Sequence, residues 1–319
     1  MDTPPPTPLN AGSLFERFAL ARLKRIGARG RWLETASTPL HAIELPEGRA
    51  GARERAAARP PLVLVHGIGS SAASYGPLLA LAAPEFRSLV APSAPAHGVS
   101  PPHPSVMDAE ELFGVWREAL DALSEREPVA LLGTSLGGAV ALRYALERPA
   151  RVRALVLCSP AGPRMTAAQI EEVRARFHMG SLGDGARFLS LLFDKPPFLS
   201  PLLGLAVRSS LRGEPVQELL RTLTPEVGLS RRALGALAVP TLLFWGKRER
   251  VLPSGLLDLY REALPAHLTT ILEPPRFSHS PQLEHTSELL AATLSWLDAQ
   301  LDAQLDAQRA TRSPPQEPA

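Results

Sequence analysis

The chain has 319 residues, enough for one large domain with a lid or for two modest domains. Hydrophobic residues make up 45% of the chain and charged residues 21%, as in a globular protein with a sizeable core. The formal net charge is only +2, and no stretch combines clustered basic residues with interleaved aromatic side chains, so we exclude a nucleic-acid partner.

The cysteine content and the apolar segments indicate a cytoplasmic protein. Cys158 is the single cysteine, so an intrachain disulfide is excluded, and its position in an apolar run is typical of an inert buried thiol. No apolar stretch is long enough to span a bilayer. The first ten residues are proline-rich and lack the apolar segment of a signal peptide.

Residues 1–30 are predicted to form an N-terminal arm followed by an amphipathic helix. Four prolines make the first ten residues a poorly ordered arm. Ser13 can cap a helix that runs to about Ile26, with apolar residues on one side and basic residues on another. Residues 14–26 could lie on a membrane surface. We favour the alternative that this helix packs on its own domain.

Eight short segments are predicted to form strands. Residues 32–45 fit a β-hairpin with its turn at 37–39, and residues 46–60 fit a linker. Six unbroken apolar runs follow, and such runs are typical of parallel strands buried on both faces. Helices over 107–125 and 137–147 would supply crossovers. The six runs are 62–65, 88–91, 129–132, 154–158, 240–245 and 268–272.

The interval 163–235 contains helical patterns and no predicted strand, so we expect a helical cap there. It would divide the core into 31–162 and 236–300. The helical patterns are 167–177, 185–193 and 215–223. Apolar cap residues favour an apolar substrate, although docking the cap on the core needs apolar residues as well. They are Phe188, Leu189, Leu191, Leu192, Phe193, Phe198, Leu199, Leu202, Leu203 and Leu205.

Residues 301–319 are predicted to form a helical extension and a disordered tail. The sequence Leu-Asp-Ala-Gln occurs three times in succession from Leu297 to Gln308. A period of four residues nearly matches one helical turn, so the repeat would prolong the last helix. The tail is expected from Arg309 onward.

Residues 133–138, with the sequence Gly-Thr-Ser-Leu-Gly-Gly, form the central motif between the predicted strand 129–132 and the next helix. A nucleophile on such a sharp turn has strained backbone angles, and Gly133 and Gly137 avoid collisions because they lack side chains. The turn lifts the Ser135 hydroxyl clear of the sheet, at a helix N-terminus that favours a developing anion. The motif therefore predicts Ser135 as a nucleophile.

A second glycine-rich turn, with the sequence His-Gly-Ile-Gly, directly follows the predicted strand 62–65. Its glycines let the chain turn tightly and aim a backbone N–H group at the serine. An oxyanion needs two preorganised donors, and we expect the N–H groups of Ile68 and Leu136 to supply them. We interpret His66 and Gly67 as supports of this loop.

Among the eight histidines, His279 is the predicted general base. It follows the last predicted strand by a short loop, at the sheet edge where Ser135 emerges and where open α/β proteins keep their sites. The other histidines are expected in surface hairpins or strands (His41, His267), in the cap (His178), in the final helix (His285) or beside a proline-rich loop (His97, His103).

These motifs occur in the order and spacing of the α/β-hydrolase superfamily, which the chain resembles over residues 31–300. A late Ser-His-x-Pro-x-x-Glu segment at 278–284 and the segment 239–247, similar to the family's seventh sheet segment, extend the resemblance. Within the family it is closest to serine esterases and lipases, the monoacylglycerol-lipase branch included. The resemblance implies an α/β fold: a mostly parallel eight-stranded sheet flanked by helices, with a helical cap after the sixth strand.

The resemblance also implies Glu249 as the acid of a catalytic triad. The family usually has Asp at this position, and here the sequence after Gly246 is Lys-Arg-Glu. A carboxylate is retained to orient the imidazole, and Glu serves in some members. The alternative is that 247–250 is only a solvated run of charges. The loop after the preceding strand, 154–158, contains no acidic residue, so the triad acid cannot lie there.

A second departure from the family lies in residues 91–100. Ser93 stands where Asp is common, and Ala96 stands where Gly is common. Because this loop is usually structural, the departure concerns stability or pocket shape more than chemistry.

The order Ser135, Glu249, His279 agrees with the superfamily and implies acyl transfer through an acyl-enzyme. We expect a small-molecule carboxylic ester as substrate, with a lipophilic ester favoured, and no metal or organic cofactor. The same triad also serves thioesterases, carbon–carbon bond hydrolases, haloperoxidases and acyltransferases. The alternative from another class is a catalytically silent binding protein of this fold.

Overall fold

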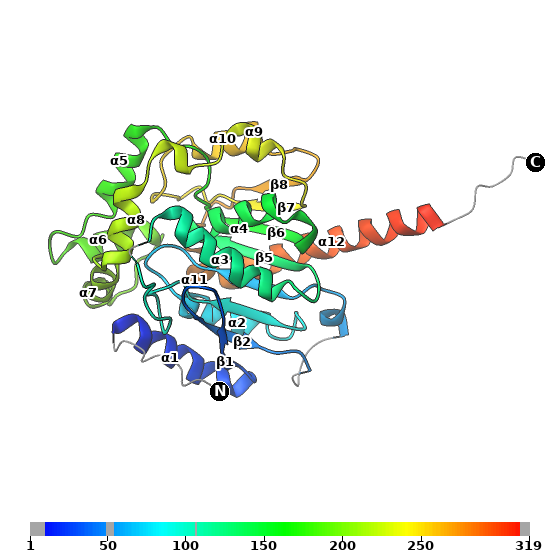
Figure 1. The fold of residues 1–319 in the computed structure, drawn as a ribbon, viewed down its shortest axis with the longest axis horizontal. Coiled ribbons are helices and arrows are strands. Elements are labelled where there is room, and N and C mark those ends of the chain that lie inside the picture. The colour runs from blue at the N-terminus through cyan, green and yellow to red at the C-terminus, as the bar shows by residue number, and fades with distance from the viewer. Residues whose placement is uncertain (1–9, 49–53, 106, 313–319) are drawn as a thin grey trace, which may run out of the picture.

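The computed structural model describes residues 10–48, 54–105 and 107–312, and Figure 1 shows its elements. The strands are β1 (Arg29–Leu33), β2 (Leu40–Leu45), β3 (Leu62–Val65), β4 (Leu89–Pro92), β5 (Val129–Thr134), β6 (Val152–Cys158), β7 (Thr241–Phe244) and β8 (Thr269–Leu272). The α-helices are α1 (Ala11–Leu23), α2 (Gly76–Ala82), α3 (Ala109–Leu123), α4 (Leu136–Glu147), α5 (Ala167–Arg176), α6 (Asp184–Leu192), α7 (Ser200–Leu211), α8 (Glu214–Thr222), α9 (Arg231–Gly235), α10 (Leu256–Ala263), α11 (Pro281–Glu284) and α12 (Thr286–Arg312).

The strands form one sheet of eight, in the order β1-β2-β4-β3-β5-β6-β7-β8. β1 and β2 form an antiparallel hairpin, and β2 is also antiparallel to β4. All other neighbours are parallel. The predicted mostly parallel sheet of eight strands is thereby confirmed. Parallel order brings the loops after β3, β5, β7 and β8 to one edge of the sheet.

The apolar runs form strands because both faces of the sheet are covered. In β3, Val63 and Val65 enter one hydrophobic cluster, which includes side chains of α3, α4 and α10. Leu62 and Leu64 enter a second cluster, with side chains of α2 and α12. Successive side chains of a strand point to opposite faces, so an unbroken apolar run satisfies both clusters.

The helical cap, α5–α9, is inserted after the sixth strand, as predicted. Its helices α6 and α7 pack closely where Gly185 meets Gly204. A Cβ atom on Gly185 would lie 1.8 Å from the carbonyl oxygen of Gly204, so the close approach requires a residue without a side chain. α7 was not among the helices predicted for the cap. It has Pro201 at its second position and Gly204 in its interior, and such residues weaken a helical pattern in the sequence.

The N-terminal helix α1 begins at Ala11, three residues before the predicted start at Leu14. The prediction that Ser13 is the N-cap was wrong: Asn10 Oδ1 accepts a hydrogen bond from the Ser13 N–H (2.8 Å), and Ser13 Oγ accepts one from the Asn10 N–H (3.1 Å). This reciprocal pair is a capping box. A 3₁₀ turn, Lys24–Ile26, follows the helix.

The last helix, α12, continues through the Leu-Asp-Ala-Gln repeat to Arg312 and projects away from the body of the molecule (Figure 1). Residues 309–312 are therefore helical, where a tail was expected, and 313–319 lie outside the described residues. The predicted arm over 1–9 and residues 49–53 of the predicted linker also lie outside them. In the part of the chain that the structure describes, no helix has the length and apolarity needed to cross a membrane.

Candidate active site

Ser135 lies in the sharp turn between β5 and α4. Its backbone angles, φ 55° and ψ −121°, fall in a region that costs a residue with a side chain about 1–3 kcal/mol. Hydrogen bonds to the adjacent strand hold the turn. The Ser135 N–H donates to the Cys158 carbonyl (3.1 Å), and the Ser135 carbonyl accepts from the Ala161 N–H (3.0 Å).

Two glycines permit this turn. A Cβ atom on Gly137 would lie 2.0 Å from the carbonyl oxygen of Val65, and one on Gly133 would lie 2.4 Å from the carbonyl oxygen of Gly137. Real side chains do not come so close to backbone atoms. The glycines of the motif therefore let α4 and the loop after β3 lie against the serine.

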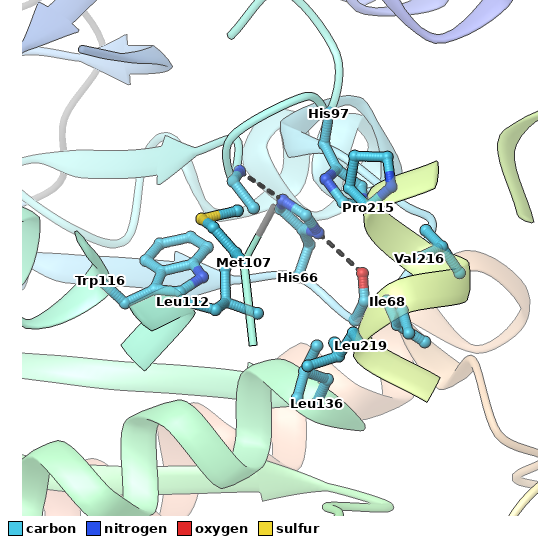
Figure 2. Close-up of a pocket in the computed structure, with 12 residues that line it drawn as sticks. His66, Ile68, His97, Met107, Leu112, Trp116, Leu136, Pro215, Val216 and Leu219 are labelled. Atoms are coloured by element: carbon cyan, nitrogen blue, oxygen red, sulfur yellow. Dashed lines mark hydrogen bonds between the residues drawn. The ribbon is translucent and has the colours of Figure 1, made fainter. Parts of the chain in front are cut away.

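The loop after β3 is braced by two histidines, the buried His66 and the half-buried His97. His66 Nδ1–H donates to the Gly67 carbonyl (2.8 Å), and His66 Nε2 accepts from the Ala94 N–H (2.9 Å), as Figure 2 shows. His97 Nε2 accepts from the Gly69 N–H (3.1 Å). Burial, together with the neighbouring His97, lowers the pKa of His66 to about 3. Its neutral ring has both nitrogens engaged with the backbone, so it holds the loop in place.

A small cavity of about 20 Å³ lies behind this loop (Figure 2). Side chains of α3 and α8 enclose it, and the ring of Trp116 meets the His66 ring edge to face, with the centroids 5.8 Å apart. The loop is thus supported from behind by packing as well as by hydrogen bonds.

The N–H groups of Ile68 and Leu136 flank Ser135. Among the described residues, the Ile68 N–H has no intramolecular acceptor. Leu136 is the first residue of α4, where an N–H group has no carbonyl of its own helix to bind. The Ile68 loop touches the serine closely enough that a Cβ atom on Gly67 would lie 3.2 Å from Ser135 Cβ. Their role as donors to an anion formed at Ser135 stays a prediction.

His279 and Glu249 meet at the same edge of the sheet. Glu249 lies in the loop after β7, and His279 lies between β8 and α11. His279 Nδ1–H donates to Glu249 Oε2 (2.8 Å), and both side chains are only 4% exposed. The other oxygen, Glu249 Oε1, accepts from the N–H groups of Val251 (2.7 Å) and Leu252 (3.0 Å). Glu249 is therefore no part of a solvated charge run.

The electrostatics keep Glu249 ionised. Burial by itself raises the pKa of a carboxyl group. The charge of His279 when protonated, the hydrogen bond from His279, and hydrogen bonds from the Ser159 hydroxyl and the Leu252 N–H outweigh this effect. The pKa of Glu249 consequently lies below its usual value. The carboxylate fixes the imidazole so that Nδ1 carries a proton and Nε2 is available as a base.

Ser135 and His279 line one open pocket of about 430 Å³. Phe15 of α1, Phe188 of α6 and Leu203 of α7 line its walls. Within the described residues, no hydrogen bond joins the Ser135 hydroxyl to the imidazole; such contacts are often long in the absence of substrate. Both side chains therefore face the same pocket.

A buried carboxylate from α1 lies beside the pocket and was missed in the sequence. Glu16 is fully buried, although it belongs to a surface helix. Its Oε1 lies 2.6 Å from His41 Nδ1, and its Oε2 accepts a hydrogen bond from the Ser93 hydroxyl (2.5 Å). Ser93 Oγ in turn accepts from the Ala72 N–H (2.9 Å). His41 is thus buried, and the prediction that it lies in a surface hairpin was wrong about its exposure.

Ser93 stands where related proteins commonly carry Asp, and Glu16 supplies a carboxylate to this position. The contact crosses 77 residues of sequence. A pattern-based search could flag Glu16 only as the single acid in a helix with several basic residues. That signal indicates an inward-facing acid but does not identify its partner.

Glu284, the last residue of the Ser-His-x-Pro-x-x-Glu segment, ties the His279 loop to the cap, a role that the sequence did not reveal. Its carboxylate accepts hydrogen bonds from the N–H groups of Asp194 (2.9 Å) and Lys195 (3.0 Å) and from the Ser278 hydroxyl. The Ser278 hydroxyl also lies 2.8 Å from the Leu192 carbonyl. The position of the candidate base is thereby linked to the segment between α6 and α7.

Residues 62–293 match the model of the alpha/beta hydrolase family. The chain belongs to the α/β-hydrolase family. Within the part of this α/β hydrolase that the structure describes, no group of three or more His, Cys, Asp or Glu side chains could hold a metal ion.

Curated relatives and solved structures agree with this assignment. The chain is 30% identical over 252 residues to a pimeloyl-[acyl-carrier protein] methyl ester esterase of Chromobacterium violaceum, covering 76% of this chain and 95% of that protein. It is similar to the structure of a carboxylesterase of Bacillus subtilis (TM-score 0.67, 21% identity, 90% of this chain and 98% of that one). It is also similar to 2-hydroxy-6-oxo-6-phenylhexa-2,4-dienoate hydrolase of a Rhodococcus species (TM-score 0.71, 17% identity, 85% and 99%). The predicted α/β-hydrolase fold is confirmed.

Proposed function

We propose that this α/β hydrolase is a serine esterase that cleaves a lipophilic carboxylic ester with Ser135, His279 and Glu249. The observation that carries the proposal is the buried 2.8 Å hydrogen bond between His279 Nδ1 and Glu249 Oε2, beside a pocket that His279 and Ser135 both line. This is the arrangement of base and orienting acid that activates a serine hydroxyl.

The reaction consists of two acyl transfers. His279 Nε2 accepts the Ser135 hydroxyl proton as Oγ bonds to the ester carbonyl carbon. The Ile68 and Leu136 N–H groups donate to the resulting oxyanion. Collapse breaks the carbon–oxygen bond to the alcohol, which leaves with the proton held on His279. Water then loses a proton to His279 as its oxygen bonds to the acyl carbon, and breakage of the bond to Ser135 Oγ releases the acid while His279 returns the proton to Oγ.

Glu249 acts on the base and does not exchange protons itself. Its second oxygen is held by the N–H groups of Val251 and Leu252, which fixes a side chain one methylene longer than the Asp usual in the family. The lowered pKa keeps it ionised and able to stabilise the imidazolium that forms in each step.

Two observations support an ester with an apolar acyl chain. The pocket walls carry Phe15, Phe188 and Leu203, and few polar side chains lie among the residues of the cap that line it. The relative of Chromobacterium violaceum carries the name of a methyl ester esterase, which supports ester chemistry over the carbon–carbon bond cleavage of the Rhodococcus enzyme. Membership of the monoacylglycerol-lipase branch remains a prediction, as does the division into core and cap at 163 and 235.

The test is hydrolysis of p-nitrophenyl esters from acetate to palmitate by the wild-type chain and by Ser135→Ala. We expect turnover by the wild type with a preference for medium or long acyl chains, and loss of turnover in the variant. Labelling by a fluorophosphonate probe, present in wild type and absent in Ser135→Ala, provides a readout that needs no substrate.

The outcomes separate the alternatives. A wild-type chain that is labelled but cleaves no oxygen ester would direct attention to thioesters or carbon–carbon substrates. Absence of both labelling and turnover would favour a silent binding protein. A strong preference for acetate over octanoate would contradict the lipophilic substrate.

A further inference from the structure

Large apolar side chains exposed to solvent gather on two segments in contact, α1 with its 3₁₀ turn, and α7 with the residues just before it. Twelve such side chains are exposed among the described residues, and nine of them belong to these two segments. The exposed large apolar side chains are therefore concentrated in one region and not spread singly over the surface. We call this set the apolar rim. Its members are Leu14, Phe15, Phe18, Ile26, Phe198, Leu199, Leu202, Leu203 and Leu205.

The apolar rim borders the pocket mouth. Phe15 and Leu203 belong both to the rim and to the pocket that contains Ser135. Figure 1 shows α1 and α7 adjacent on one side of the molecule. Phe18 is 58% exposed and Phe198 is 98% exposed, and neither lines the pocket. Packing of the cap on the core therefore does not account for them.

Within the two segments that carry the apolar rim, the exposed charged side chains are basic. Arg17, Arg22, Lys24 and Arg25 are exposed on α1 and its 3₁₀ turn, and the only acid there is the buried Glu16. The segment 195–213, which contains α7, has two arginines and one lysine and no acidic residue. Two copies of such a surface would repel each other. An apolar surface with basic residues complements a layer of acyl chains beneath anionic headgroups.

The buried contacts of Glu16 orient the helix for this role. Because Glu16 bonds Ser93 and His41, the face of α1 that carries it is turned inward. Residues one or two positions away along a helix lie on other faces, so Phe15 and Phe18 remain outside. On the other side of the rim, the Ser210 hydroxyl of α7 donates to the Gly69 carbonyl in the loop beside Ser135 (2.8 Å).

We propose that the apolar rim docks this protein on an anionic lipid surface, with the pocket mouth facing the lipid. The exposed phenylalanines and leucines enter the acyl layer, and the arginines contact the headgroups. An ester dissolved in the lipid then reaches Ser135 without crossing water, a consequence that rests on the proposed esterase function.

The test uses the full chain with the substitution Ser135→Ala, so that binding is measured without turnover. Sedimentation with vesicles of phosphatidylglycerol and of phosphatidylcholine is compared at low and at high salt. We expect binding to phosphatidylglycerol that weakens in high salt, because the headgroup attraction is screened, and weaker binding to phosphatidylcholine.

Variants then locate the surface. Neutralising two arginines of α1 beside the apolar rim, Arg17→Gln with Arg22→Gln, should lower the vesicle partition coefficient about 25-fold, since each basic residue near an anionic surface contributes about fivefold. The matched control neutralises the exposed Arg126 and Arg153, which lie at the starts of β5 and β6, the opposite edge of the sheet. It should change the partition coefficient less than about threefold, because these residues face away from the lipid.

The apolar contribution is tested with Phe18→Ser and Phe198→Ser together, which should weaken binding at least about tenfold at any salt concentration. Hydrolysis of a dissolved short ester by the same double variant in the Ser135 background checks that the pocket is intact, because neither residue lines it.

Three results would overturn the proposal: no sedimentation of the chain with phosphatidylglycerol at low salt, equal losses in the rim and control arginine variants, or a stable dimer that Phe18→Ser and Phe198→Ser dissociate. The last result would assign the rim to a second copy of the chain. Vesicle binding by a chain that cleaves no ester would leave the docking surface standing and remove the esterase proposal.

Discussion

The floor and the rim of the pocket differ in how firmly their side chains are held and in how much of them solvent reaches. At the floor, the turns that carry Ser135 and His279 are buried. Backbone hydrogen bonds, close packing at glycines and the hydrogen bond from His279 to the Glu249 carboxylate fix their geometry. At the rim, α1 and α7 leave phenylalanine and leucine side chains exposed around the opening.

This difference indicates what each region requires. Chemistry at Ser135 depends on donors and a base held in position, so the floor tolerates little change. Contact with a fluid lipid surface requires area and charge but no exact geometry, so the rim should accept substitution without loss of folding. The following predictions test that contrast, from the largest expected effect to the smallest.

The largest effect is expected at the glycine of the serine turn. Gly137→Ala places a Cβ atom 2.0 Å from the Val65 carbonyl, and we expect it to destabilise the protein by more than about 5 kcal/mol and to prevent soluble expression. The matched control is Gly114→Ala in α3, where no heavy atom lies within 4 Å of the added Cβ. It should raise the free energy of unfolding by up to about 1 kcal/mol, measured by urea denaturation. Equal behaviour of the two variants would contradict the close approach at the floor.

Glu249→Gln should lower kcat about 1,000-fold with p-nitrophenyl esters, because an amide no longer holds the imidazole in the productive tautomer or stabilises its charge. KM should change little. A variant with nearly full activity would show that Glu249 is not the acid of this site.

The same variant tests the lowered pKa of Glu249 through stability. A carboxylate whose folded pKa lies below its usual value of 4.5 stabilises the protein above that pH, and the contribution is lost as the pH falls further. The difference in Tm between wild type and Glu249→Gln should therefore be greatest near pH 7 and shrink below pH 4.5. A constant difference across this range would contradict the ionised, bonded carboxylate.

Two cap phenylalanines provide a direct comparison of the inward and outward faces. Phe188 is buried against Phe177, with ring centroids 4.8 Å apart, whereas Phe198 is almost wholly exposed. Phe188→Ala should cost about 3–5 kcal/mol in urea denaturation, and Phe198→Ala should stay within about 0.5 kcal/mol of wild type. A large loss for Phe198→Ala would mean that this side chain packs in the folded protein.

A smaller effect is expected where α1 meets the body. Glu16→Ala leaves Ser93 and His41 without their buried partner and should cost about 2 kcal/mol. Adding Ser93→Asp in that background should recover about half of the loss, while Ser93→Asp alone should destabilise through repulsion of two carboxylates. If the change in Tm of the double variant equals the sum of the changes in the two single variants, Glu16 and Asp at position 93 do not supply a carboxylate to the same position.

Much of the floor could be predicted from local sequence. The apolar runs, the turn around Ser135 and the order of the motifs each depend on residues close together in the chain, and the predicted run 62–65 coincides with β3. The bond between Glu249 and His279 was proposed from a resemblance, because only the three-dimensional loop geometry brings the two side chains to 2.8 Å.

The rim and its supports were harder to predict. The apolar cap residues were ambiguous between docking and substrate contact, and the structure divides them: Phe188 and Leu189 are buried while Leu202 and Leu205 are exposed. Which side chains of a short helix point inward depends on the elements that pack against it. For the same reason the inward position of Glu16 was missed, since its partners lie far along the chain.

The contact between Glu16 and Ser93 has a consequence for how this family diverges. Glu16 provides a carboxylate from a helix 77 residues before Ser93, the loop residue that binds it. An alignment of the loop alone would therefore show a missing Asp, although a carboxylate is still present at this position in the structure. We expect the two positions to covary among close homologues: an acid in the N-terminal helix with Ser at the loop, or Asp at the loop with a neutral residue in the helix. In chains of the first kind the N-terminal helix would supply part of the hydrolase core, and we expect its deletion to be selected against even where lipid binding is not needed.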